Sequence, residues 1–244
     1  MDTSITTRTT GALPDSWYAF HFGSKFANST SFDPETLYGA INRECYIMLA
    51  DFCSFTSFFK ATEDLALIDP LMTSFYSQIR KAIHKHFGML DKIIGDSVVA
   101  VWGLHVWEEN IVQSIFNAAQ EMVAIARQIA AEWQSQIDLL IEPKGLRLGL
   151  SKGPIVVIRR DPVYPGISIL GNPINLAARL QAAAQPNQLV CSNLVYKDIE
   201  KAGLNVTLVP YKNESSEEFL NAKNFGMVKA WVLNMNAKPE LQRL

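Results

Sequence analysis

Two aspartates, each beside an apolar run, are the residues of this chain whose type and spacing most directly suggest chemistry. Asp51 follows the run 45–50, and Asp96 lies between the runs 89–94 and 97–102. A carboxylate at the end of a buried strand is costly to desolvate unless something compensates its charge. Either aspartate alone could be an ordinary strand end or a Gly-Asp turn. Two on neighbouring strands favour a divalent cation with oxygen ligands, such as Mg²⁺ or Mn²⁺.

A second polar pair lies on a predicted short helix. Asn175 and Arg179 are four residues apart and therefore share one face, whereas Leu176 and Leu180 fall on another and can pack inward. A guanidinium can donate two parallel hydrogen bonds to phosphate oxygens. The simpler alternative is a solvated arginine capped by the asparagine.

Three segments, 50–56, 91–103 and 171–180, together resemble the catalytic domain of class III nucleotidyl cyclases. The resemblance runs from about residue 42 to about residue 233. It implies an intramolecular cyclisation of a nucleoside triphosphate to a 3′,5′-cyclic nucleotide with release of pyrophosphate. Two divalent cations suit this chemistry, because they lower the pKa of the ribose 3′-hydroxyl and neutralise the triphosphate.

The resemblance also implies a role for each matching residue near the first two segments. Asp51 and Asp96 would hold two cations, Mn²⁺ or Mg²⁺, and Phe52 would add its backbone carbonyl to one of them. Phe55 and Thr56 would lie against the substrate.

For the third segment, the resemblance implies that Asn175 orients the ribose and that Arg179 stabilises the charge developing at the α-phosphate. Lys223 matches only loosely the lysine that binds the outer phosphates in the family. Arg159 and Arg160 are cationic alternatives without an assigned role.

Lys92 and Ser168 stand where cyclases carry the residues that read the base. Lysine only donates hydrogen bonds, so it can serve an acceptor of uracil or adenine but not the donor edge of guanine. A lone chain of this kind also resembles the stand-alone pyrimidine cyclases of bacterial anti-phage systems, which signal to a cyclic-nucleotide-binding effector. We therefore expect UTP as substrate and cyclic UMP as product. Adenylate cyclase activity on ATP is the alternative, and a simple ion pair is the plainer role for Lys92.

The sequence departs from the family in two places. Ser54 replaces a usual glycine, and 156–161 lacks the glycines that follow the paired valines. A catalytically silent cyclase-like domain that binds nucleotide to regulate a partner is the remote alternative, but both aspartates and the Asn/Arg pair are present. A diguanylate cyclase relative would need a Gly-Gly-Asp/Glu-Glu-Phe turn, which is missing from the sequence.

This one chain has the two aspartates as well as the base-reading and phosphate-binding residues. In the family, the aspartates of one subunit face the base-reading and phosphate-binding residues of the other. The resemblance therefore implies a head-to-tail homodimer with two equivalent sites at its interface.

Hydrophobic periodicity predicts a ferredoxin-like α/β (α+β) fold of order βαββαβ, with a mixed sheet covered by helices on one face. We expect an extension over 1–41, partly flexible, and a catalytic domain over 42–244. The expected strands are 45–50, 89–94, 97–102, 146–150, 155–158, 167–170, 189–191, one near Val206 and 228–233. The expected helices start at the N-caps Asp69 and Asn172, a third helix runs from Ser192, and a further helix covers 110–133.

An aromatic arm in the extension should pack on its own domain or on a second copy, because its side chains are too apolar to leave in water. They are Trp17, Tyr18, Phe20, Phe22 and Phe26.

Composition and charge limit the remaining function classes. The net charge of −2 does not predict binding to nucleic acid or to a membrane surface. Three widely spaced cysteines predict buried thiols rather than disulfides or a zinc site. No apolar run is long enough to span a bilayer, and the N-terminus lacks a signal-peptide pattern, so we expect a soluble cytoplasmic protein.

Overall fold

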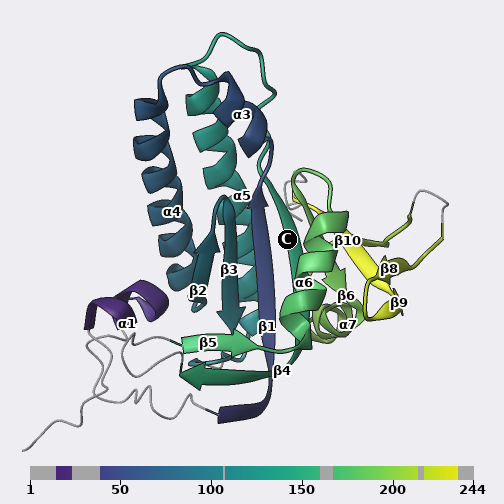
Figure 1. The fold of residues 1–244 in the computed structure, drawn as a ribbon. Coiled ribbons are helices and arrows are strands. Elements are labelled where there is room, and N and C mark those ends of the chain that lie inside the picture. Colours follow the sequence, from purple (N-terminus) through teal and green to yellow (C-terminus); the bar gives the residue numbers. More distant parts are fainter. Residues whose placement is uncertain (1–14, 24–38, 107, 160–166, 214–216, 236–244) are drawn as a thin grey trace, which may run out of the picture.

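The computed structural model describes residues 15–23, 39–106, 108–159, 167–213 and 217–235. Its main sheet has the order β2-β3-β1-β4-β6-β10-β7, and β5 pairs with β4 beside this path (Figure 1). The strands are β1 (Gly39–Phe52), β2 (Met89–Ile94), β3 (Ser97–Trp102), β4 (Leu146–Arg159), β5 (Ile167–Leu170), β6 (Gln188–Ser192), β7 (Leu208–Pro210) and β10 (Ala230–Asn234). β4 and β6 are parallel and the other pairs are antiparallel, so the predicted mixed sheet is confirmed.

Helices and one small ribbon complete the described part of the chain. The helices are α1 (Asp15–Phe22), α3 (Phe55–Ala61), the 3₁₀ helix η2 (Leu65–Leu67), α4 (Ile68–Lys85), α5 (Ile111–Gln134), α6 (Asn172–Ala183) and α7 (Asn193–Ala202). Strands β8 (Leu220–Ala222) and β9 (Gly226–Val228) form a separate two-stranded ribbon.

The sheet has a buried cluster on each face. On β1, Tyr46 and Met48 point into the cluster under α4 and α5, which lie side by side (Figure 1). The alternate residue Ile47 points into a second cluster, which also contains Phe22 of α1 and Ala177 of α6. The expectation of helices on one face was therefore wrong, because α1 and α6 cover part of the other.

Helix α6 approaches the sheet so closely that only glycine fits beneath it. A Cβ on Gly149 of β4 would lie 2.1 Å from the backbone oxygen of Ala177 and 2.3 Å from the backbone nitrogen of Gln181. The missing side chain at this position therefore sets how near α6 and its polar residues lie to β1 and β4.

Several predicted boundaries shift. The strands predicted at 146–150 and 155–158 are one strand, β4, whose pairing with β1 continues through Lys152–Pro154. Pro154 is tolerated there because it lies opposite Glu44, where the register of β1 shifts. The strand predicted at 228–233 is divided between β9 and β10, and the strand predicted near Val206 is β7, from Leu208.

Both predicted N-caps were wrong. Asp69 lies in the first turn of α4, because η2 leads directly into that helix, and Asp64 caps η2 instead. Gly171 rather than Asn172 is the N-cap of α6. The helix predicted from Ser192 is α7, and Ser192 is its N-cap.

Helix α1 confirms that the aromatic arm packs on its own domain, with Phe22 only 1% exposed. Phe26 and residues 1–14 lie outside the described residues, and the boundary between 1–41 and 42–244 stays a prediction. All three cysteines lie in the described part, are buried and form no disulfide. Among the described residues, no helix is long and apolar enough to cross a membrane.

Candidate active site

Asp51 lies at the end of β1 between two donors from neighbouring strands. In the sheet register it is opposite Ser97 of β3 on one side and Arg147 of β4 on the other. Ser97 Oγ donates to Asp51 Oδ1 at 2.7 Å, and Arg147 Nη2 donates to Asp51 Oδ2. The Asp51 side chain is 14% exposed, so its position is well fixed.

Asp96 lies in the turn between β2 and β3, next to Asp51. Gly95 takes the left-handed conformation that this turn needs, with φ +59°. The Tyr76 hydroxyl of α4 donates to the Gly95 carbonyl at 2.8 Å and so fixes the turn to a helix. Burial, and then the negative charge of Asp51, raise the pKa of Asp96.

These two carboxylates fit a divalent cation. The charge of Asp51 disfavours the charge of Asp96, and a bound cation would relieve that repulsion. Arg147 supplies one positive charge to Asp51 in this structure. Within the described residues no group of three or more His, Cys, Asp or Glu gathers, so further oxygen ligands would come from backbone, water or substrate.

The segment after Asp51 keeps its aromatic rings in the core. The Phe52 ring is 1% exposed and lies 5.1 Å from the Phe75 ring, so only its backbone is left for a ligand. Phe55 packs edge-on against Trp133 at 5.8 Å, whereas Thr56 is exposed in the first turn of α3.

Ser54 explains the departure from the family at this turn. It has φ +64°, the left-handed conformation that glycine adopts at no steric cost. The serine keeps the turn that starts α3, at a strain of about 1–2 kcal/mol.

A cavity of about 420 Å³ beside α6 brings together three predicted residues. Asn175 and Arg179 of α6 line it, and so does Lys223, which the sequence matched only loosely. All three side chains are exposed. The remaining lining residues are Asn172, Ala178, Asn224 and Phe225, so the turn between β8 and β9 forms one wall.

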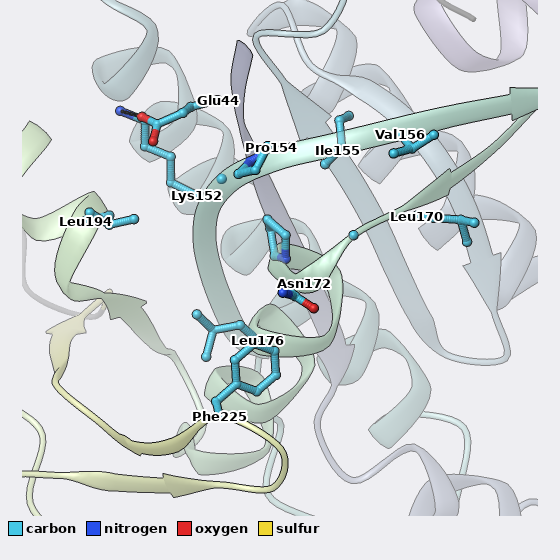
Figure 2. Close-up of a pocket in the computed structure, with 13 residues that line it drawn as sticks. Glu44, Lys152, Pro154, Ile155, Val156, Leu170, Asn172, Leu176, Leu194 and Phe225 are labelled. Carbon is cyan, nitrogen blue, oxygen red and sulfur yellow. Dashed lines mark ion pairs between the residues drawn. The ribbon is translucent and has the colours of Figure 1, made fainter. Parts of the chain in front are cut away.

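A second cavity, of about 470 Å³, adjoins the first and shares Asn172 and Phe225 with it. Figure 2 shows the ion pair of Lys152 and Glu44 beside it, and Leu170 of β5 in its wall. The Lys152 ammonium also lies 2.8 Å from an Asp198 oxygen. These pairs join β1, β4 and α7.

The predicted base readers lie on different strands. Lys92 is on the edge strand β2, where its ammonium lies 3.0 Å from Asp91. Ser168 is on β5, opposite Ile158 of β4, and is partly buried. Arg160 lies outside the described residues, and only the backbone of Arg159 is described.

Arg147 is the residue that sequence reasoning missed. It is separated from Asp51 by 96 positions in the sequence, yet the two are direct neighbours in the sheet register. The only sequence signal is a charged residue inside the apolar run 146–150.

Residues 38–231 match the family model of the adenylate and guanylate cyclase catalytic domain. The chain belongs to this family. The cyclase domain is similar to the guanylyl cyclase Cya2 (TM-score 0.65, 17% identity, 83% of this chain and 98% of that chain). It is also similar to the adenylyl cyclase CyaB from P. aeruginosa (TM-score 0.66, 20% identity, 82% and 98%).

Curated relatives are longer than this chain. An uncharacterized protein of Mycobacterium tuberculosis is 31% identical over 75% of the chain and 40% of its own length. The soluble guanylate cyclase subunit beta-2 of Homo sapiens is 24% identical over 67% of the chain and 25% of its own length. The chain thus spans two fifths or less of these relatives.

Proposed function

We propose that this cyclase domain converts a nucleoside triphosphate into a 3′,5′-cyclic nucleotide and pyrophosphate. The observation that carries the proposal is the division of the polar residues into an acidic set around Asp51 and Asp96 and a cationic cavity around Arg179 and Lys223. Two divalent cations, Mg²⁺ or Mn²⁺, would bind the acidic set. When bound, they would neutralise the triphosphate and lower the pKa of the attacking hydroxyl.

In the reaction the ribose 3′-oxygen forms a bond to the α-phosphorus as its proton is released. The bond from the α-phosphorus to the bridging oxygen breaks, and pyrophosphate leaves with that electron pair. Arg179 is the group suited to the charge that develops on the α-phosphate, since a guanidinium donates two parallel hydrogen bonds. Asn175 would orient the ribose, and Lys223 would bind the outer phosphates.

The Arg147 guanidinium gives the acidic set a positive charge from its own chain. A cation bound to Asp51 would compete with the Arg147 guanidinium for that carboxylate. We propose that Arg147 binds the outer phosphates of the substrate, which need charge neutralisation in a loose transition state.

Neither Asp51 nor Asp96 lines the cationic cavity. We therefore propose that a head-to-tail homodimer brings the acidic set of one copy to the cationic cavity of the other across its interface. Solved relatives include a guanylyl cyclase domain described as a non-canonical dimer and one described as monomeric. Each of two sites would then take Asp51 and Asp96 from one copy and Asn175, Arg179 and Lys223 from the other.

For the base we propose uracil, with Lys92 donating to a carbonyl oxygen and Ser168 accepting from the ring N–H. The product would be cyclic UMP, acting on a cyclic-nucleotide-binding effector in anti-phage signalling. ATP is the second candidate. Lys92 can equally serve adenine N1, and a relative of 24% identity from Mycobacterium tuberculosis is named adenylate cyclase.

The test is incubation of the protein with each of the four triphosphates and Mn²⁺, with products resolved by mass spectrometry. We expect cyclic UMP and stoichiometric pyrophosphate. Cyclic AMP as the main product would show that the site selects adenine rather than uracil. Cyclic GMP as the main product would exclude Lys92 as the residue that reads the base. No cyclic product from any of the four would overturn the proposed activity.

A further inference from the structure

A buried carboxylate lies directly beside the proposed base-reading lysine. The Asp91 side chain is 1% exposed, whereas the Lys92 side chain is 29% exposed, and Lys92 Nζ lies 3.0 Å from Asp91 Oδ2. A carboxylate this deep is tolerated only with a paired charge or hydrogen bonds. It also cannot reach a nucleotide, so any effect on the base must pass through Lys92.

Neighbouring residues of a regular strand could not form this pair, because their side chains point to opposite faces. The register between β2 and β3 shifts here, with Leu90 opposite Ala100 and Lys92 opposite Val99. Asp91 is the extra residue of this bulge. A bulge breaks the alternation and re-aims side chains, so it allows the two charges to meet.

The register also places Lys92 on the functional face of the sheet. Its partner Val99 belongs to the cluster that contains Ile47 and packs beside Leu49. Asp51 is two residues after Leu49 on β1 and therefore points to the same face. The bulge thus aims the lysine toward the face that carries the metal-binding aspartate.

We propose that Asp91 is a positioning residue that fixes the Lys92 ammonium for base selection; this rests on the proposed function of Lys92. Lysine carries its charge on a flexible four-carbon stem with three rotatable donors. The ion pair with Asp91 restricts where the ammonium can lie and so reduces the entropy lost when a base binds. Discrimination between bases therefore depends on the buried carboxylate as well as on the lysine.

The experiment measures kcat and KM of the full chain for all four triphosphates. We expect Asp91→Asn to raise KM for the preferred triphosphate and to reduce its kcat/KM advantage over GTP about tenfold, with a smaller change in kcat. Lys92→Met should reduce that advantage at least as much. In the double variant, Asp91→Asn should change the ranking no further, because its effect passes through Lys92. Glu121→Gln, which removes the carboxylate charge that pairs with Lys85 and His86, is the matched control and should leave the ranking unchanged.

The outcomes separate the two proposals. If wild type makes no cyclic nucleotide, or if Lys92→Met leaves the ranking intact, the proposed role of Lys92 fails and the positioning role with it. If Lys92→Met changes the ranking but Asp91→Asn does not, the positioning role alone is overturned. Should Asp91→Asn not fold, Asp91→Glu keeps the charge but moves it by one methylene, and an unchanged ranking overturns the proposal. If neither variant folds, Asp91 is a structural residue and the proposal is also overturned.

Discussion

The acidic set and the cationic cavity differ in how firmly the chain holds them. Asp51 is 14% exposed and takes hydrogen bonds from Ser97 and Arg147, on the strands at either side. Arg179 and Lys223 are exposed, and within the part of the chain that the structure describes neither has an ion-pair partner. One set is organised by its own domain. The other presents its charges outward.

This contrast is what a shared site requires. Metal-binding carboxylates repel each other and have to be held in place by a rigid sheet before the cation arrives. Phosphate-binding cations do best when they meet the substrate at the moment that a second surface closes over it. Gly149 fits this division, because it fixes the backbone of α6 while leaving the side chains of Asn175 and Arg179 at the surface.

The largest expected effect comes from the acidic set. Asp51→Ala or Asp96→Ala should lower the rate of cyclic nucleotide formation by about 10³-fold or more at saturating Mn²⁺, because metal activation supplies several kcal/mol to the barrier. Asp69→Ala is the matched control, since that aspartate is exposed in the first turn of α4. Initial rates that stay within tenfold of wild type in either variant would remove the aspartates from catalysis.

The second test asks whether the two sets come from different copies. Asp51→Ala and Arg179→Ala should each be inactive alone. Mixing them in equal amounts should recover about a quarter of the wild-type rate, because half of the dimers are mixed and one of their two sites is intact. The readout is activity after mixing, with subunit exchange followed by two differently tagged copies. Full exchange without recovery would show that each site lies within one copy.

The sequence predicted the elements whose apolar pattern is long and regular. The helix near 110–133 appears as α5 because its apolar side chains recur on a buried face. The hairpin 89–94 and 97–102 appears as β2 and β3, and β3 is a continuous buried apolar run. The short elements α3, η2 and the β8–β9 ribbon were missed, since three to seven residues carry too little periodicity.

The site residues also divide into those that a local motif reveals and those that depend on how distant segments pair. Asp51, Asp96, Asn175 and Arg179 could be selected because each stands in a local motif. The contact between Arg147 and Asp51 could not be predicted, since it depends on the register of two strands far apart in the sequence. Nor could a bulge at Asp91, because the two adjacent charged residues in 89–94 do not indicate which residue of the strand lacks a partner on β3.

A smaller effect is expected in the cationic cavity. Lys223→Met should raise KM for the triphosphate about tenfold with little change in folding, because one exposed charge contact to the outer phosphates is worth about 1–2 kcal/mol. Lys229→Met is the control, since that lysine is exposed and lies over the Phe219 ring, 5.9 Å from its centroid. Equal KM values for the two variants would remove Lys223 from the phosphate site.

The smallest effect compares the two aspartates through stability rather than activity. Asp96→Asn should raise the Tm of the metal-free protein by a few degrees, because it removes a partly buried charge beside Asp51. Asp51→Asn should lower the Tm instead, since it weakens the hydrogen bonds from Arg147 and Ser97.

Thermal unfolding with a chelator present gives both values, and adding Mn²⁺ gives the sign of the metal contribution. Wild type should gain stability from Mn²⁺, because the cation binds only the folded state, and Asp96→Asn should gain less. A Tm for Asp96→Asn below that of wild type without metal would mean that the Asp96 carboxylate is already compensated within the chain. The repulsion between the two aspartates would then not be what draws a cation to this site.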